Sequence, residues 1–273
     1  MIIKICLDAG HYGKYNRSPA NKAYYESEMN WKLHLLLLKY LIQHGFTVIQ
    51  TRTDQTKDMA LTTRGKKAKG CDLFLSIHSN AVAGGVDESI DYPVVYKPIS
   101  GAGSDLAEKL AKCIAEVMDT KQSGRTSSRK GNNGDYYGVI RGATSVGVPG
   151  LILEHSFHTN TRATNWLLDD ENLDKLAQAE ANVLAEHFST QNNTESKGVC
   201  NVEIKVLKKG AKGSEVKALQ TLLIGYGYSC GDSGADGSFG SATDKAVRTY
   251  QKAMGLEVDG SVGKATWSKL LGA

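Results

Sequence analysis

Three short apolar runs are the sequence feature that most constrains the fold of this chain. Each is rich in aliphatic side chains, and each stops at or shortly before a residue that can bind a metal ion or carry a proton. The runs are IIKICLD (2–8), DLFLSI (72–77) and PGLIL (149–153), and the residues are His11, His78 and Glu154. Such runs, separated by helical patterns, predict buried strands of a parallel sheet. Ligands gather at the carboxyl ends of such strands, so we expect the three side chains to share one cleft.

The first two thirds of the chain alternate strand and helix patterns. Apolar residues recur at helical spacing in 28–44, which ends before Gly45, and 46–52 then has the pattern of a strand. The same reasoning predicts helices at 61–69, 105–118 and 172–188 and a further strand at 91–97. The alternation predicts one α/β domain over 1–188, with a mainly parallel sheet flanked by helices. The polar, basic segment 119–134 is expected to be a mobile loop that borders the substrate.

The remainder predicts a connector and a second, small all-α domain. Residues 189–198 contain no apolar side chain, which is typical of a flexible connector, and we place this connector at 189–204. Within 205–273, the segments DGSFGSATDKAV (236–247) and DGSVGKATWSKL (259–270) match each other at a spacing of 23 residues. Each combines an Asp-Gly turn with the start of a helical pattern. The pattern predicts a bundle of three helices.

The composition excludes several classes of function. A formal charge of +4 without dense basic runs disfavours nucleic acid as a partner, and no stretch is long enough to span a membrane. The five cysteines are an odd number with no CxxC pair, so we interpret them as reduced and structural. The first residues lack the features of a signal peptide, which predicts synthesis in the cytoplasm.

The histidines at the ends of the first two runs predict a zinc site. Hydrolytic zinc has three protein ligands and an open position for water. His11 and His78 supply two ligands, whereas either alone is more often a satisfied, partly buried imidazole. The third is Glu26 or Glu28, because both lie at the start of the predicted helix. Glu154 ends an apolar run, where an unpaired acid is costly, so it is the expected general base.

The roles of other polar residues stay open at this point. His155 and His158, beside Glu154, either orient the substrate or simply pack. Arg64 and Arg141 contact either the substrate or the scaffold, and the scaffold is favoured. Histidines on predicted helices, which are His34, His44 and His187, are expected to be core or solvated residues.

Residues 1–188 resemble the amidase type 3 family of zinc-dependent N-acetylmuramoyl-L-alanine amidases. The matching segments, in the order of that family, are LDAGHYG, ESEMNW, TRTDQTKDMALTTRGKKAK, SIHSNA and PGLILEHSFHTN. The resemblance implies zinc ligands at His11, Glu26 and His78, with Asn30 and Trp31 fixing Glu26 rather than Glu28, and a catalytic role for Glu154. The chain departs from the family at Ala9, at Tyr12 and in the EHSF segment.

The second domain is similar to the peptidoglycan-binding module of three helices. Together the two resemblances imply a hydrolase that binds bacterial peptidoglycan and cleaves the amide between N-acetylmuramic acid and L-alanine of the stem peptide. Without a signal peptide, such an enzyme is expected to reach the wall after release, as a phage endolysin or a bacterial autolysin. The alternatives are a zinc peptidase of the stem peptide, a glycan deacetylase and a non-catalytic wall-binding protein. The sequence does not indicate an oligomeric state.

Overall fold

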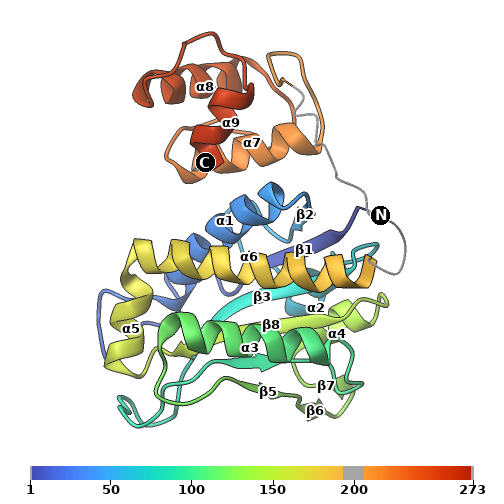
Figure 1. The fold of residues 1–273 in the computed structure, drawn as a ribbon, viewed down its shortest axis with the longest axis vertical. Coiled ribbons are helices and arrows are strands. Elements are labelled where there is room, and N and C mark those ends of the chain that lie inside the picture. The colour runs from blue at the N-terminus through green and yellow to red at the C-terminus, as the bar shows by residue number, and fades with distance from the viewer. Residues whose placement is uncertain (1, 193–205, 272–273) are drawn as a thin grey trace. The chain divides into compact units, whose positions relative to one another are not determined.

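The computed structural model describes residues 2–192 and 206–271, in two compact units, 1–197 and 198–273. The first unit contains a six-stranded sheet of order β2-β1-β3-β8-β4-β5 (Figure 1). Its strands are β1 (Lys4–Ala9), β2 (Thr47–Gln50), β3 (Leu73–Asn80), β4 (Val94–Tyr96), β5 (Arg125–Ser127) and β8 (Gly150–Phe157). Neighbouring strands are parallel except β4 with β8. The predicted α/β fold with a mainly parallel sheet is confirmed.

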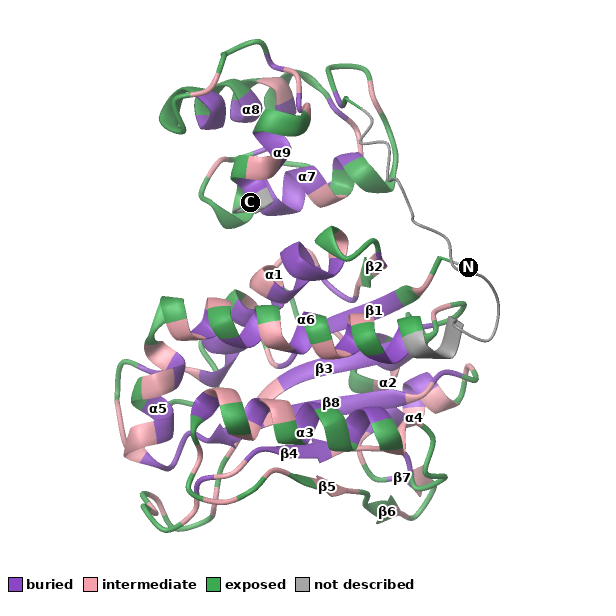
Figure 2. Ribbon diagram, viewed as in Figure 1, coloured by how far each residue is buried: buried purple, intermediate pink, exposed green. Residues whose placement is uncertain are grey.

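Helices cover both faces of this sheet. The helices of the first unit are α1 (Glu26–Gln43), α2 (Leu61–Lys66), α3 (Ser104–Met118), α4 (Gly138–Thr144), α5 (Thr161–Leu168) and α6 (Asp170–Asn192). Helices α1, α3 and α6 pack on one face, which we call the α6 face (Figure 1). Helix α4, with α2 packed beside it, covers the other, which we call the α4 face. The central strands between these layers are almost entirely buried (Figure 2).

Alternation along the strands decides which side chain faces which helix layer. In β8, Leu151 and Leu153 join the apolar core of the α6 face, whereas Ile152 joins the smaller core under α4. In β3, Ile77 belongs to the α6 face and Phe74 to the α4 face. The same parity assigns His78 and Glu154, which are paired in register, to the α4 face.

Two of the predicted strands are longer than the apolar runs that define them. Strand β3 continues to Asn80 and β8 continues to Phe157, and the two remain paired there. His78 and Glu154 therefore lie inside strands rather than beyond strand ends, which corrects the expectation. The run of apolar residues marks only the part of a strand that both helix layers cover, because polar residues extend the ladder wherever the layers end.

The expectation of a mobile loop over 119–134 is wrong. Strand β5 lies in this segment and pairs with β4, and β6 (Lys130–Gly131) forms a hairpin with β7 (Gly134–Asp135). These strands are short and polar and contain no apolar alternation. Because β5 is an edge strand, burial does not select its side chains, and no periodic signal results.

The first domain also extends past its expected end. Helix α6 runs to Asn192, so the first residues of the connector expected at 189–204 are helical. The rest of that connector lies outside the described residues.

The second unit contains the three helices that its sequence predicts. They are α7 (Ser214–Gly225), α8 (Ser241–Ala253) and α9 (Lys264–Leu271), around a core that includes Phe239, Tyr250 and Trp267. The internal repeat appears in the structure as two equivalent sets of hydrogen bonds, each made by one glutamine side chain. The side-chain nitrogen of Gln220 donates to Asp236, Ser238 and Thr243, and that of Gln251 donates to Asp259, Ser261 and Thr266. Each buried glutamine thus ties an Asp-Gly turn to the helix that follows it.

Candidate active site

His11 lies in the loop that follows β1, in the left-handed backbone region with a φ of 58°. This conformation is uncommon for a residue with a side chain and needs support from its surroundings. Arg52 provides it, because its guanidinium donates to the backbone carbonyls of Ala9 and His11. Tyr15 stacks on the imidazole, with ring centroids 4.8 Å apart. Sequence reasoning did not assign this role to Arg52.

Glu26 is the first residue of α1, and only 2% of its surface is exposed. The N-terminus of a helix favours a negative charge. Its carboxylate accepts hydrogen bonds from the backbone N–H of Ser79 at 3.2 Å and from the side-chain amide of Asn16 at 2.6 Å. Glu28 instead extends toward solvent, where its carboxylate lies 3.7 Å from Lys14. The structure therefore brings Glu26, and not Glu28, to the histidines.

His78 completes a compact cluster. Its Nδ1 lies 2.9 Å from one oxygen of Glu26, and the other oxygen lies 3.2 Å from Nε2 of His11. The three ligand atoms all lie within 4.8 Å of one another. Gly10 makes this approach possible, because a Cβ at that position would lie 2.2 Å from Cε1 of His78. The side chain of Glu26 thus faces both imidazoles, one with each oxygen.

The electrostatics of Glu26 match a cation site. Burial alone raises its pKa, but the contacts with His11 and His78 outweigh burial and hold the pKa well below its usual range. The carboxylate is therefore charged at neutral pH. Two imidazoles with one carboxylate are a usual donor set for catalytic zinc, and their separation suits a shared ion. Within the described part of the chain, this is the one such group of three or more His, Cys, Asp or Glu side chains.

Glu154 lies directly across from His78 in the β3–β8 ladder. Burial raises its pKa well above the usual value, and the nearby negative charge of Glu26 raises it further. Its Oε2 atom is buried and has no hydrogen-bond partner among the described residues. Such an orphaned acceptor is costly unless a ligand or water satisfies it. The arrangement is an acid with a free oxygen beside the cluster of His11, Glu26 and His78.

His155 and His158 both pack, which answers the alternative left open by the sequence. His155 is fully buried on the α6 face, with Nε2 2.6 Å from Glu180 of α6 and Nδ1 2.9 Å from the carbonyl of His78. His158 lies 2.9 Å from the hydroxyl of Ser79. Both are buried, and His155 links the core to the backbone of His78. Sequence reasoning missed Glu180, which contributes a second buried carboxyl group.

The two arginines have different surroundings. Arg64 is buried and donates to Asp58 and to the carbonyl of Met59, so it is a scaffold residue. Arg141, in α4, donates to the backbone carbonyls of Asp135 and Tyr136, and it also lines a surface pocket.

Comparisons with known proteins identify the family. Residues 5–186 match the model of the N-acetylmuramoyl-L-alanine amidase family, and residues 212–270 match that of a peptidoglycan-binding domain. The chain is thus a peptidoglycan hydrolase with a wall-binding module. It belongs to the N-acetylmuramoyl-L-alanine amidase family and cleaves the amide between N-acetylmuramic acid and L-alanine. No helix among the described residues is long and apolar enough to cross a membrane.

Similar proteins agree with this assignment. The chain is 27% identical over 232 residues to the amidase CwlM of Bacillus licheniformis, covering 82% of this chain and 85% of that one. Cwp6 of Clostridium difficile is 25% identical with a TM-score of 0.60, over 68% of this chain and 29% of that one. An N-acetylmuramoyl-L-alanine amidase of Clostridium difficile 630 shares the fold, with 21% identity and a TM-score of 0.60 over 70% of this chain and 98% of that one.

Proposed function

We propose that this amidase is zinc-dependent, with His11, Glu26 and His78 as the ligands and Glu154 as the general base. The observation that carries the proposal is the position of Glu154, which lies in register with His78 and has a buried oxygen without a partner among the described residues. When bound, zinc supplies a Lewis acid that polarises the amide carbonyl and makes water more acidic.

The residues of the chain have distinct tasks in this scheme. Glu154 takes a proton from the water that adds to the carbonyl carbon, and passes it to the nitrogen of L-alanine as the carbon–nitrogen bond breaks. Asn16 and the backbone of Ser79 orient Glu26 through hydrogen bonds. His155 holds the backbone of His78. The products are a glycan that keeps its lactyl groups and a peptide that begins with L-alanine.

Metal content and product analysis of the full chain test this proposal. Glu154→Gln is expected to bind zinc with normal stoichiometry and to lose about 10²- to 10⁴-fold in turnover. His11→Ala and Glu26→Ala are expected to lose zinc, whereas Glu28→Gln, the matched control two residues away, keeps both zinc and activity. Full activity of Glu154→Gln, or of a chelated enzyme, would contradict the proposal. Cut stem peptides or released acetate would favour a peptidase or a deacetylase.

We further propose that the second unit holds the enzyme on peptidoglycan, which the match of residues 212–270 supports. Tethering raises the concentration of a catalytic unit beside an insoluble substrate. The inactive Glu154→Gln protein allows a binding measurement without hydrolysis. It is expected to sediment with purified sacculi, and protein that remains in the supernatant at every sacculus concentration would contradict tethering.

A further inference from the structure

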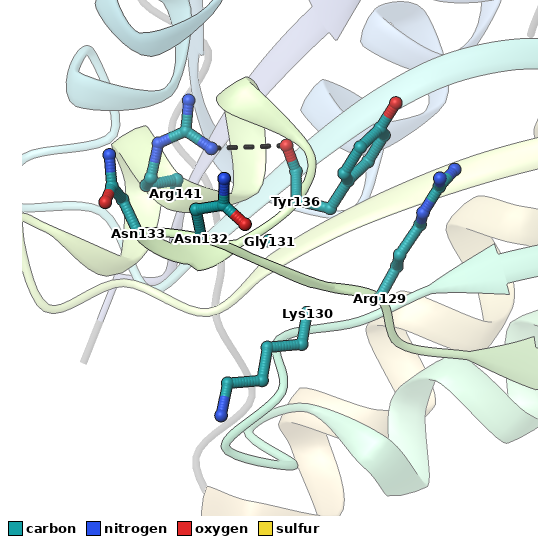
Figure 3. Close-up of a pocket in the computed structure, with 7 residues that line it drawn as sticks. All are labelled: Arg129, Lys130, Gly131, Asn132, Asn133, Tyr136 and Arg141. Atoms are coloured by element: carbon teal, nitrogen blue, oxygen red, sulfur yellow. Dashed lines mark hydrogen bonds between the residues drawn. The ribbon is translucent and has the colours of Figure 1, made fainter.

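A pocket of about 380 Å³ lies between the β6–β7 hairpin and the start of α4 (Figure 3). The polar side chains that line it are those of Arg129, Lys130, Asn132, Asn133, Tyr136 and Arg141. These residues supply two guanidinium groups, one ammonium group, two carboxamides and one phenol. All of them can donate hydrogen bonds, so the lining is suited to a ligand that accepts them.

The positive charge of this pocket is not neutralised by the protein. No acidic side chain lines it, and in the described ranges neither Arg129 nor Arg141 forms an ion pair. Asp135, which precedes Tyr136 in the chain, accepts hydrogen bonds through its carboxylate from the backbone N–H of Ile99 and the hydroxyl of Thr144. An anionic ligand would therefore meet two uncompensated guanidinium groups.

Both guanidinium groups are held in place before any ligand binds. Arg129 lies over the ring of Tyr136, 3.7 Å from its centroid, and the two side chains project together (Figure 3). One nitrogen of Arg141 is fixed by the carbonyls of Asp135 and Tyr136, at 2.7 and 3.2 Å. The other N–H groups of Arg141 have no partner among the described residues. Preorganised guanidinium groups suit a planar carboxylate, which they can bind through two parallel hydrogen bonds.

The pocket lies on the same face of the sheet as Glu154. In the ladder between β8 and β4, Glu154 is opposite Val94, and Tyr96 follows two residues later on the same face. The ring of Tyr96 is 4.6 Å from that of Tyr137, the residue after Tyr136. Burial is the main reason that the pKa of Tyr137 is raised; Tyr96 and Glu154 raise it further and Arg129 lowers it. Tyr137 is thus close enough to interact electrostatically with both Glu154 and Arg129.

These contacts set a lower limit for the separation of Glu154 from the pocket. Two residues of β4 span about 6.6 Å, and the ring contact of Tyr96 with Tyr137 adds a few ångströms. An extended peptide advances roughly 3.3 to 3.6 Å for each residue, so three residues cover about 10 Å. Tyr137 is the neighbour of the pocket residue Tyr136, so a peptide that starts at the scissile amide beside Glu154 needs at least about three residues to reach the pocket.

We propose that the pocket of Arg129 and Arg141 binds a free carboxylate of the stem peptide and so selects substrates in which that group is not amidated. This inference rests on the proposed function in one respect. It assumes that the stem peptide starts beside the general base Glu154 and extends along the α4 face.

Steady-state kinetics with paired substrates test this proposal. The substrates are soluble muramoyl peptides with each free carboxylate of the stem in turn replaced by a carboxamide. For one of these positions, the wild-type enzyme is expected to have a KM about tenfold lower for the carboxylate than for the carboxamide. Arg129→Gln is expected to remove this preference while its zinc content and its kcat on the carboxamide substrate stay unchanged.

Lys112 of α3 offers a control outside the pocket. It is an exposed lysine on a helix that packs on the other face of the sheet. Lys112→Gln removes the same charge and is expected to keep the preference. Equal KM values for all wild-type substrate pairs would overturn the proposal, as would equal effects of the two variants, which would indicate general attraction to an anionic wall. If the wild-type enzyme binds zinc normally but hydrolyses none of these substrates, the result would instead refute the proposed function.

Discussion

His34 should make the stability of the catalytic unit depend on pH. It lies on α1, only 1% of its surface is exposed, and neither ring nitrogen has a hydrogen-bond partner in the described ranges. Burial lowers its pKa to about 3, and the positive charge of Arg52 contributes to the decrease. The folded protein therefore keeps His34 neutral, whereas an unfolded chain protonates it near the ordinary value of 6.5.

The size of the effect follows from the two pKa values. Below pH 6.5 the unfolded state binds a proton that the folded state excludes, so the free energy of unfolding falls as the pH falls. Each pH unit between 6.5 and 3 is worth about 1.4 kcal/mol, so His34 costs about 2 kcal/mol at pH 5 and almost nothing at pH 7.5. His34→Leu removes the titrating group and its two unsatisfied nitrogens.

Urea unfolding of both proteins at pH 7.5 and pH 5, in the presence of a chelator, measures this difference. When the pH falls from 7.5 to 5, the free energy of unfolding of the variant is expected to increase by about 2 kcal/mol relative to that of the wild type. The second unit is identical in both proteins, so its unfolding cancels in the comparison. His44→Leu, which changes the exposed C-cap residue of the same helix and leaves His34 in place, is the control. Parallel pH profiles for wild type and His34→Leu would refute the reasoning.

Two further substitutions probe the support of the metal cluster. Glu180→Ala leaves His155 buried without its acidic partner and is expected to cost about 3 to 5 kcal/mol in urea unfolding; a loss below about 1 kcal/mol would show that the pair is not a buried ion pair. Gly10→Ala puts a Cβ 2.2 Å from the ring of His78, so zinc affinity measured by competition with a coloured chelator should fall roughly 10- to 100-fold. Gly240→Ala, in open space of the second unit, is its control, and equal zinc affinity in both variants would argue against the steric reasoning.

The strands and helices that bury an apolar face could be predicted from the sequence, because burial imposes periodicity. This holds for the three apolar runs, for α1, α2, α3 and α6 and for the repeat of the second unit, but not for the short helices α4 and α5, which no sequence pattern predicted. It fails for β5, β6 and β7, whose polar residues lie at an edge. It also fails at the ends of β3 and β8, where hydrogen bonding continues after apolar burial stops.

The choice between Glu26 and Glu28 shows a different limit. Two residues apart on a helix, their side chains point in nearly opposite directions, about 200° around the axis. The residues alone give the spacing but not the rotation of α1 against the sheet, and the resemblance to the family was needed to choose. Asn16, Ser79 and Glu180 left no signal at all, because each acts through a partner that only the folded chain brings near.

The register of β8 against β3 decides which side chain faces the cluster. Glu154 and His155 are adjacent and point to opposite faces, and a shift of one residue would exchange them. Leu151 and Leu153 prevent this shift, because it would move them from the core of the α6 face to the α4 face. The buried pair of His155 and Glu180 opposes it as well, since the shift would leave the buried carboxyl group of Glu180 without its partner. Packing on the α6 face therefore specifies the acid that lies beside His78 on the α4 face.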